Sequence, residues 1–430
     1  MIGVSIFVII LTVIVFSKTK PDEQAISIGV QGNVLIWSTV PVDPAVIGQI
    51  VEVFTKSYGE SVSLRYVPVD PAQLYTSLLE AIASGQGPDV LLIPDDQLLR
   101  LNNRLTTIPY TTLEQRTFVD AFVPGVSPFV RPEGVLLYPI AVDPLVLYTN
   151  SDIFMKYGVL RKPQYWDDYL TLVKTFTTKD RSGKIDQSAI ALGEYANIVN
   201  AKSIISLLML QTGSPIVAPL TLRSVILTDE NAVAVNSGIR FFMDFSDPRK
   251  DTYTWSRSKQ DSRTEFLKGT LASYIGFASE SSKLKTMNPH MNFTVSLVPQ
   301  PREVKVPVTL GRYVGFAIVK SSKNQPASQF VVKYLTMGTD AKLLSDSLHM
   351  QPVRIDILEK RPIDADGSLF FDAAYQTRTW LDPYPEKTEV LFRNMIESIS
   401  SAKLTIAQSI AEAESGLKLL LPSTTPADAK

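Results

Sequence analysis

Cysteine is absent from the 430-residue sequence, and histidine occurs only twice, at His290 and His349. Without a thiol the chain cannot use cysteine catalysis, a zinc–thiolate site, a disulfide bond or a lipid-modified N-terminal cysteine. Two separated histidines are too few for most serine-hydrolase and metal-hydrolase sites, and the sequence has no glycine-rich phosphate loop. We therefore predict a protein that is not an enzyme and that holds neither a metal nor a cofactor.

An excess of either charge is also missing, because 42 basic residues face 43 acidic ones and the net charge is −1. Non-specific binding to nucleic acid needs a clustered basic surface, so no nucleic-acid partner is predicted. A hydrophobic share of 45% and a charged share of 20% are ordinary for a globular protein. The chain is long enough for two or three domains of about 100 to 200 residues each.

Charged side chains are missing from Met1 to Phe16, and Lys18 and Lys20 follow this apolar run. A helix of this length would span about 24 Å, slightly less than the bilayer core of about 30 Å. A cleaved signal peptide is the alternative, but no small-residue cleavage site is clear. We predict an uncleaved membrane anchor at 1–17 and a linker at 18–31. The protein would then be held at the cell membrane by a single pass, with the rest outside the cytoplasm.

Strands and helices alternate in the first third of the chain. Apolar or alternating runs at 34–37, 61–68 and 90–93 predict strands. Between them, Asp43 and Asp70 each precede a proline and an apolar stripe at helical spacing, as expected for N-caps. This βαβαβ pattern predicts a mostly parallel α/β sheet. Ligands of such sheets bind beyond the C-terminal ends of the strands. The polar and aromatic residues at those ends are Trp37, Thr39, Asp95 and Asp96.

The stretch 138–150 has an extended apolar character, and Pro139 and Pro144 exclude a helix through it. Segments of the same α/β style lie before and after it, so we interpret it as a strand that crosses between two lobes. Its one acid, Asp143, would then lie beside the cleft between the lobes. A second crossover is expected at 295–301.

The predicted division of the chain follows from these crossovers. The first lobe comprises 32–141 and 302–348, and the second comprises 142–301 and 349–421. The tail at 422–430 has the composition of a disordered segment.

Four phrases occur in order at 83–89, 138–150, 163–167 and 266–272. The first resembles the glycine-proline-aspartate signature of extracytoplasmic solute-binding proteins. The second resembles the lobe-crossing segment of maltose-binding protein and its relatives. The third resembles their proline-x-threonine-tryptophan-acid helix start, with Tyr165 in place of threonine. The fourth resembles their phenylalanine-x-x-glycine segment, and departs from it at its end. The resemblance covers roughly residues 32 to 420.

This resemblance implies an α/β, periplasmic-binding-protein-like fold, in which two lobes joined by a multi-strand hinge enclose a ligand cleft. It also implies a protein, expected to be a monomer, that closes on a small molecule and delivers it to the permease of an ABC importer. Carbohydrate is the commonest ligand class of this branch. A sugar cleft needs carboxylates and amides for hydroxyl groups, and flat aromatic rings for the ring face.

The candidate ligand-binding residues are Trp37, Thr39, Asp95, Asp96, Asp143, Tyr195, Asn197, Tyr274, Phe277, Arg312, Tyr313 and Trp380. The resemblance singles out Asp96 and Asp143 as acidic contacts. Structural roles are the alternatives: a hinge acid for Asp143, a helix cap for the acids after the third strand, and core packing for the aromatic residues.

Other functions stay open at this point. A carbohydrate hydrolase would need two carboxyl groups about 5 to 10 Å apart, which Asp96 and Asp143 could provide. No eight-stranded barrel is indicated, however. Within the binding-protein interpretation, the ligand could be an anion, a metal or a polyamine. Iron would need paired tyrosines, for which Tyr274 and Tyr313 are available. A membrane-tethered sensor or adhesion module on the same fold is a third alternative.

Overall fold

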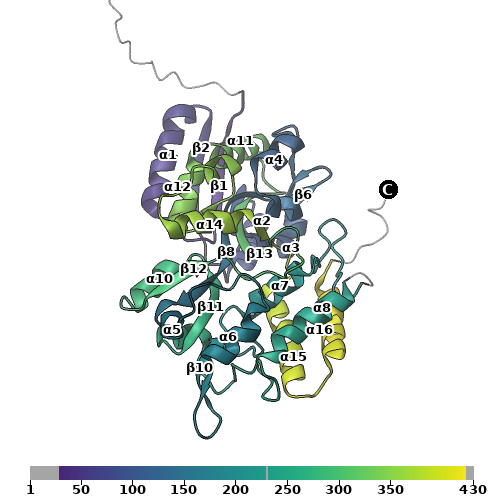
Figure 1. The fold of residues 1–430 in the computed structure, drawn as a ribbon. Coiled ribbons are helices and arrows are strands. Elements are labelled where there is room, and N and C mark those ends of the chain that lie inside the picture. The colour runs from purple at the N-terminus through teal and green to yellow at the C-terminus, as the bar shows by residue number, and fades with distance from the viewer. Residues whose placement is uncertain (1–28, 229–230, 423–430) are drawn as a thin grey trace, which may run out of the picture.

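The computed structural model describes residues 29–228 and 231–422, which form the two lobes seen in Figure 1. The predicted anchor at 1–17, the linker up to residue 28 and the tail beyond Pro422 lie outside these residues. Within the described part of the chain, no helix has the length and apolar character needed to cross a membrane.

The first lobe begins with the predicted βαβαβ unit. Strand β1 (Gly32–Ser38) lies between the parallel strands β2 (Val62–Pro68) and β3 (Val90–Pro94). Asp43 caps α1 (Pro44–Tyr58) by accepting from the Ala45 amide at 2.8 Å. The prediction for Asp70 was wrong. Its carboxylate accepts from the Ala72 amide within the preceding turn, and α2 (Leu74–Ala83) has no side-chain cap.

Strand β8 (Tyr138–Asn150) is buried along its whole length and is shared by both lobes. Its first half pairs antiparallel with β13 (Thr309–Val319), and its second half pairs with β11 (Leu271–Phe277) and β12 (Phe293–Ser296). A single sheet therefore continues through both lobes, in the order β2-β1-β3-β13-β8-β11-β10-β9. The predicted crossover at 138–150 is confirmed.

Glycines on β13 allow it to lie against the prolines of β8. Gly311 faces Pro144 and Gly315 faces Pro139 across the pair. A Cβ atom at Gly315 would lie 2.4 Å from the Tyr138 carbonyl oxygen, so no larger residue fits this approach without moving a strand. The register shifts by one residue beside Gly315, where the strand cannot keep a regular ladder opposite proline.

The second lobe places helices around its part of the sheet. Its remaining elements are α5 (Ser151–Lys156), α6 (Asp168–Phe176), β9 (Thr178–Lys179), β10 (Ile185–Ile190), α7 (Ala201–Gln211), α8 (Ala232–Asp244), α9 (Ser262–Leu267), α10 (Glu280–Met287), α15 (Pro385–Ser400) and α16 (Ile406–Leu420). A capping box made by Thr405 and Gln408 opens α16.

The remaining elements complete the first lobe and the hinge. They are α3 (Leu98–Leu101), β4 (Leu105–Thr106), β5 (Ile108–Pro109), α4 (Gln115–Ala121), β6 (Val130–Arg131), β7 (Gly134–Val135), α11 (Gln325–Met337), α12 (Asp340–Ser347), β14 (Gln351–Pro352), α13 (Ile355–Leu358), α14 (Ala365–Tyr375) and β15 (Thr377–Arg378), with the 3-10 turns η1 (Asp95–Gln97), η2 (Asn102–Arg104) and η3 (Pro124–Phe129).

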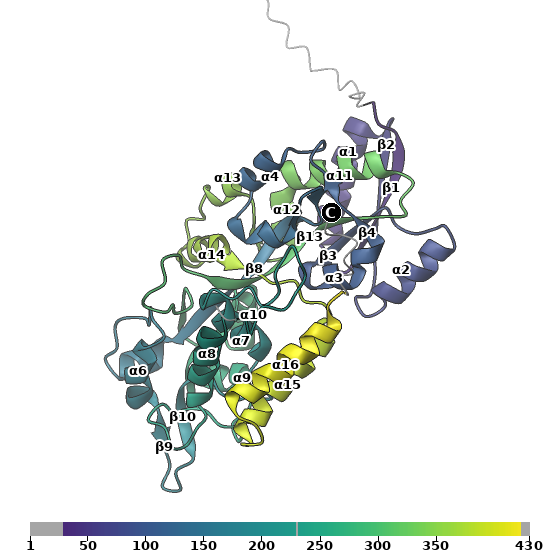
Figure 2. The same cartoon turned by 90° about the vertical axis from the view of Figure 1, so that its right-hand side faces the viewer.

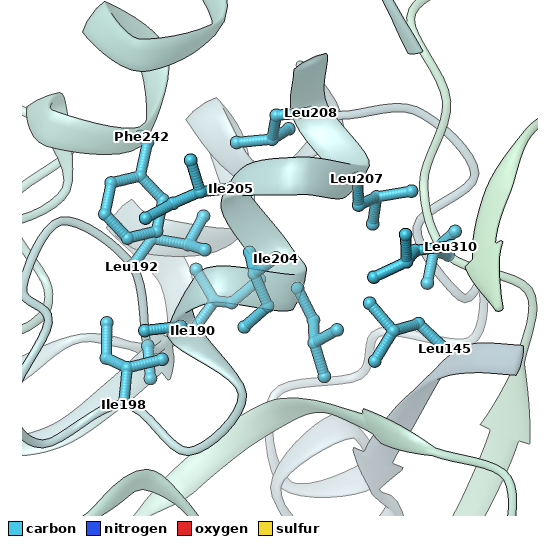
Figure 3. Packing of buried hydrophobic residues seen from close by; sticks show 14 of the residues in the cluster. Leu145, Ile190, Leu192, Ile198, Ile204, Ile205, Leu207, Leu208, Phe242 and Leu310 are labelled. Carbon is cyan, nitrogen blue, oxygen red and sulfur yellow. The ribbon is translucent and has the colours of Figure 1, made fainter. Parts of the chain in front are cut away.

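Each lobe has its own hydrophobic core. Figure 3 shows part of the core of the second lobe, where the aliphatic side chains of α7 meet Leu145 of β8 and Leu310 of β13. The chain returns to this lobe later than the predicted residue 349. Val353 and Leu358 pack in the core of the first lobe, and Trp380 is the next large residue in the core of the second.

Candidate ligand-binding cleft

A cavity of about 530 Å³ lies between the lobes. The turn after β3 and the crossing strand β13 line one side, and the start of α7 and the start of α15 line the other. The prediction that ligands bind beyond the strand ends fits this location. Half of the candidate residues line the cavity: Asp95, Asp96, Tyr195, Phe277, Arg312 and Trp380.

Aromatic rings line the cleft and are largely covered by their neighbours, because Phe277 is 1%, Tyr195 3% and Trp380 6% exposed. Trp380 stacks on Phe392 of α15 with the ring centroids 6.1 Å apart. Its indole N–H makes no hydrogen bond to a residue in the described part of the chain. The guanidinium carbon of Arg312 lies 3.6 Å from the ring centroid of Phe277. The hydroxyl of Tyr195 donates to the Glu389 carbonyl oxygen at 3.2 Å.

Several functional groups of the cleft were not predicted from the sequence. Lys202 of α7 donates to Asp382 at 2.5 Å and to the Thr388 hydroxyl at 2.7 Å. Glu386 and Glu389 line the same wall from α15. Lys202, Glu386 and Glu389 lie on two helices of the second lobe, and Asp382 lies just before one of them. Nothing in the local sequence indicates that the two helix starts meet.

Carboxyl groups of the cleft have raised pKa values because they are buried. Burial, followed by the nearby Asp96 charge, raises the pKa of Asp95 to about 8. Burial also raises the pKa of Asp96, and the Asp382 charge acts in the same direction. Burial raises the pKa of Asp382 as well, although Lys202 opposes this shift. Asp95 is therefore mostly protonated at neutral pH. Its oxygens accept hydrogen bonds from the Tyr313 amide and the Thr379 hydroxyl.

Replacing Asp95 with asparagine should remove a pH dependence of stability. A carboxyl whose pKa is near 4 when unfolded and about 8 when folded binds more protons in the folded state between these values. The protonated carboxyl stabilises the folded state fully below a pH of about 4, and this stabilisation is lost as the pH rises toward about 8. The free energy of unfolding should fall by up to about 1.4 kcal/mol per pH unit over this range. Asparagine keeps the shape and cannot ionise, so the stability of Asp95→Asn should fall less with pH over this range than that of the wild type, and the remaining slope comes from Asp96 and Asp382, whose pKa values are also raised.

The measurement is urea unfolding of both proteins at several pH values. Asp186→Asn is the control, because Asp186 is exposed and its replacement leaves Asp95 in place. This control should reproduce the wild-type pH dependence. An Asp95→Asn protein with the wild-type slope would show that Asp95 does not change its protonation state in this range.

Asp143 does not line the cavity. Its carboxylate is 2% exposed and accepts from the Ser279 amide at 3.0 Å, the Ser279 hydroxyl at 2.6 Å and Arg312 at 2.8 Å. The prediction that Asp143 faces a wet cleft is corrected by this burial. Arg312, which is half exposed, carries the contact to the cleft instead.

The other candidate residues are also absent from the cavity lining. Asn197 donates to the Ser256 and Lys259 carbonyl oxygens and accepts from the Trp255 indole, so its amide is fully used. Trp37 packs against the core of the first lobe, and Thr39 is half-buried beside the end of β1.

The tyrosines proposed for iron lie apart. Tyr274 belongs to the core of the second lobe and donates to Glu280 at 2.7 Å, whereas Tyr313 belongs to the core of the first and bonds to Thr377. In the described part of the chain, no group of histidine or acidic side chains could hold a metal ion.

A model of the bacterial extracellular solute-binding protein family matches residues 39–342, which is most of the chain. The chain belongs to this family. The resemblance stated from the sequence is therefore confirmed. The family consists of binding proteins, and its extracellular location agrees with the predicted placement of the lobes outside the cytoplasm. No curated protein matched the chain.

Solved structures of similar fold include several binding proteins. A cyclo/maltodextrin-binding protein complexed with maltotetraose is 15% identical, with a TM-score of 0.71 over 90% of this chain and 96% of that one. The cyclic α-maltosyl-1,6-maltose binding protein from Arthrobacter globiformis is 15% identical, with a TM-score of 0.69 over 91% of this chain and 99% of that one. The maltose/maltodextrin-binding domain MalE from Bdellovibrio bacteriovorus, bound to maltotriose, is 16% identical, with a TM-score of 0.61 over 90% and 99%. The predicted periplasmic-binding-protein-like fold is thus confirmed for this solute-binding protein.

Proposed function

We propose that this solute-binding protein captures a carbohydrate in the cleft between its lobes and closes around it. The observation that carries the proposal is the lining of the cleft, where the rings of Tyr195, Phe277 and Trp380 lie among carboxylates and cations. Sugars need flat aromatic surface beside hydrogen-bond donors and acceptors. The relatives complexed with maltotetraose and maltotriose support a saccharide as the ligand class.

The charges of the cleft favour a neutral ligand over an anion. Lys202 is paired with Asp382, and Arg312 with Asp143. The third cation of the cleft, Arg393, lies 3.9 Å from Glu389, so a ligand anion would have to compete with a carboxylate for each of the three. The hydroxyl of Ser206, which also lines the cleft, has no partner in the described part of the chain and would suit a ligand hydroxyl or a water molecule. Asp143, one of the two carboxyl groups that a hydrolase could use, is engaged by Ser279 and Arg312, which supports binding rather than hydrolysis.

We also propose the partners and the location of the protein. A monomer would deliver the captured saccharide to the permease of an ABC importer and would itself be held by a membrane anchor at residues 1–17. The uncharged run in this part of the sequence supports the anchor. N-terminal sequencing of protein from the membrane fraction should begin at or near Met1. Recovery of a released chain that begins near residue 20 would contradict the anchor.

A ligand screen tests the proposed function. Full-length protein in detergent is heated with α-gluco- and mannooligosaccharides from disaccharide to heptasaccharide, and with sulfate and spermidine as non-sugar ligands. A ligand that binds only the folded state raises the melting temperature by mass action. We expect a concentration-dependent rise for a saccharide, which should be recovered unhydrolysed. A rise with spermidine or sulfate alone, or steady release of reducing ends, would contradict the proposal.

A further inference from the structure

A second cavity, of about 430 Å³, lies beside the cleft. Helices α2 and α3 of the first lobe and the ends of α15 and α16 of the second line it, and Figure 2 shows these elements converging. The residues at the start of α15 alternate between the two cavities. Pro385 and Glu386 line the cleft, whereas Tyr384 and Lys387 line the second cavity. This helix start is therefore the wall between them.

An ion pair between the lobes completes that wall. Arg100 of α3 contacts Glu386 of α15 at 3.1 Å. The Arg100 guanidinium lies 4.9 Å from the ring centroid of Tyr75 in its own lobe and 6.0 Å from that of Tyr384 in the other. Arg100 is thus flanked by two rings as well as by its ion pair, and only 29% of its side chain is exposed. Cation–π contacts of this kind hold the cation more firmly than an exposed ion pair alone.

The second cavity has the groups that a sugar unit requires. Its two tyrosine rings offer flat surface, and Asn103, Arg104 and Lys387 offer donors, with one acceptor from the amide. In the described structure, the Arg100 guanidinium lies over the rings of both Tyr75 and Tyr384. A saccharide that extends along the cleft toward α15 therefore meets the Arg100–Glu386 pair before it can reach these rings.

We propose that the Arg100–Glu386 pair is the end wall of the cleft and sets the length of saccharide that the protein binds, and that the cavity behind it is a further sugar site reached only when the pair is opened. This inference rests on the proposed function. It makes Arg100 and Glu386 determinants of length rather than of the type of sugar. Breaking the pair should then favour longer saccharides specifically.

The test measures dissociation constants of full-length protein by titration calorimetry along the oligosaccharide series that gives the largest thermal shift. Arg100→Ala should bind saccharides one or two units longer than the best wild-type ligand about tenfold tighter than wild type does, the gain expected for one stacked ring. The charge-reversed pair, Arg100→Glu with Glu386→Arg, restores an ion pair and should restore the wild-type length limit.

Arg116→Ala is the matched control. It removes another arginine of the first lobe from an ion pair, with Asp120 at 3.5 Å, and Arg116 lines neither cavity. It should leave the length dependence unchanged. An Arg100→Ala effect of equal size for every chain length, or a charge-reversed pair that does not restore the limit, would overturn the inference. A wild-type protein that binds no saccharide at all would overturn the proposed function, and the inference with it.

Discussion

Leucine in place of Trp380 should weaken saccharide binding roughly thirty- to a thousandfold, which corresponds to about 2–4 kcal/mol for a central aromatic contact. Trp380 lines the cleft with a ring held in place by Phe392 and Lys202. Its indole N–H makes no hydrogen bond to a described residue and is the natural donor to a sugar hydroxyl. Leucine removes both the flat surface and the donor, whereas phenylalanine should restore part of the stacking.

Loss of stability must be separated from loss of binding, because the Trp380 side chain is only 6% exposed and its replacement also affects the core. Trp166→Leu is the matched control. Trp166 is also 6% exposed, belongs to the same core and does not line the cleft. Both variants should unfold at a lower temperature than wild type. Their free energy of unfolding should fall by the few kcal/mol usual for a truncated core tryptophan. Calorimetry at a temperature where both are folded should find that only Trp380→Leu loses affinity. Equal affinities for wild type and Trp380→Leu would remove Trp380 from the site.

Local patterns were sufficient to predict the framework of the fold. The run at 138–150 is readable because a strand buried on both faces shows continuous apolar residues, and its prolines exclude the helical alternative. The N-cap at Asp43 was also correct, since its contact is made within the same turn. The return to the second lobe was misplaced because it depends on where α13 and α14 pack. Val353 and Leu358 could belong to either core as far as the sequence shows.

The site was only half predictable for a similar reason. Asp95 and Asp96 follow a strand end, where topology alone indicates a ligand site. Glu386 and Glu389 lie on one face of an amphipathic helix, and such a charged face normally contacts solvent. Only the packing of α15 against α7 brings this face to the cleft. The burial of the Asp143 carboxylate could not be predicted either, because its partners Ser279 and Arg312 are 136 and 169 residues away in the sequence.

This network gives Asp143 a role different from direct ligand contact. The carboxylate lies on the crossing strand β8 and holds the first residues before α10 of the second lobe through Ser279. It also holds Arg312 of β13, which faces the cleft and covers Phe277. Asp143 is therefore a positioning residue. It orients the cation that can contact a ligand and ties that cation to an element of the second lobe.

Asp143→Asn should weaken saccharide binding roughly 10- to 150-fold, since hydrogen bonds to a charged group are worth about 1.5–3 kcal/mol. The asparagine oxygen can still accept from the Ser279 amide. Its NH₂ group, however, would lie against the Ser279 hydroxyl and the Arg312 guanidinium, which both donate to the carboxylate in the wild type. Because the carboxylate is buried, the folded state should also lose stability, by an amount similar to other buried polar replacements, about 1–3 kcal/mol. Urea unfolding measures the stability, and calorimetry measures the affinity.

A double-mutant cycle with Arg312→Gln decides between positioning and direct contact. If Asp143 acts through Arg312, Asp143→Asn should change the dissociation constant little once Arg312 is already glutamine, so the two effects will not add. If Asp143 contacts the ligand directly, as the sequence alone suggested, the two losses should add in full. The fraction of molecules with closed lobes should show the same non-additivity. A ligand increases this fraction only as far as it binds the closed form more tightly than the open form. X-ray scattering at saturating saccharide should then show equal compaction for the Arg312→Gln protein and the double variant.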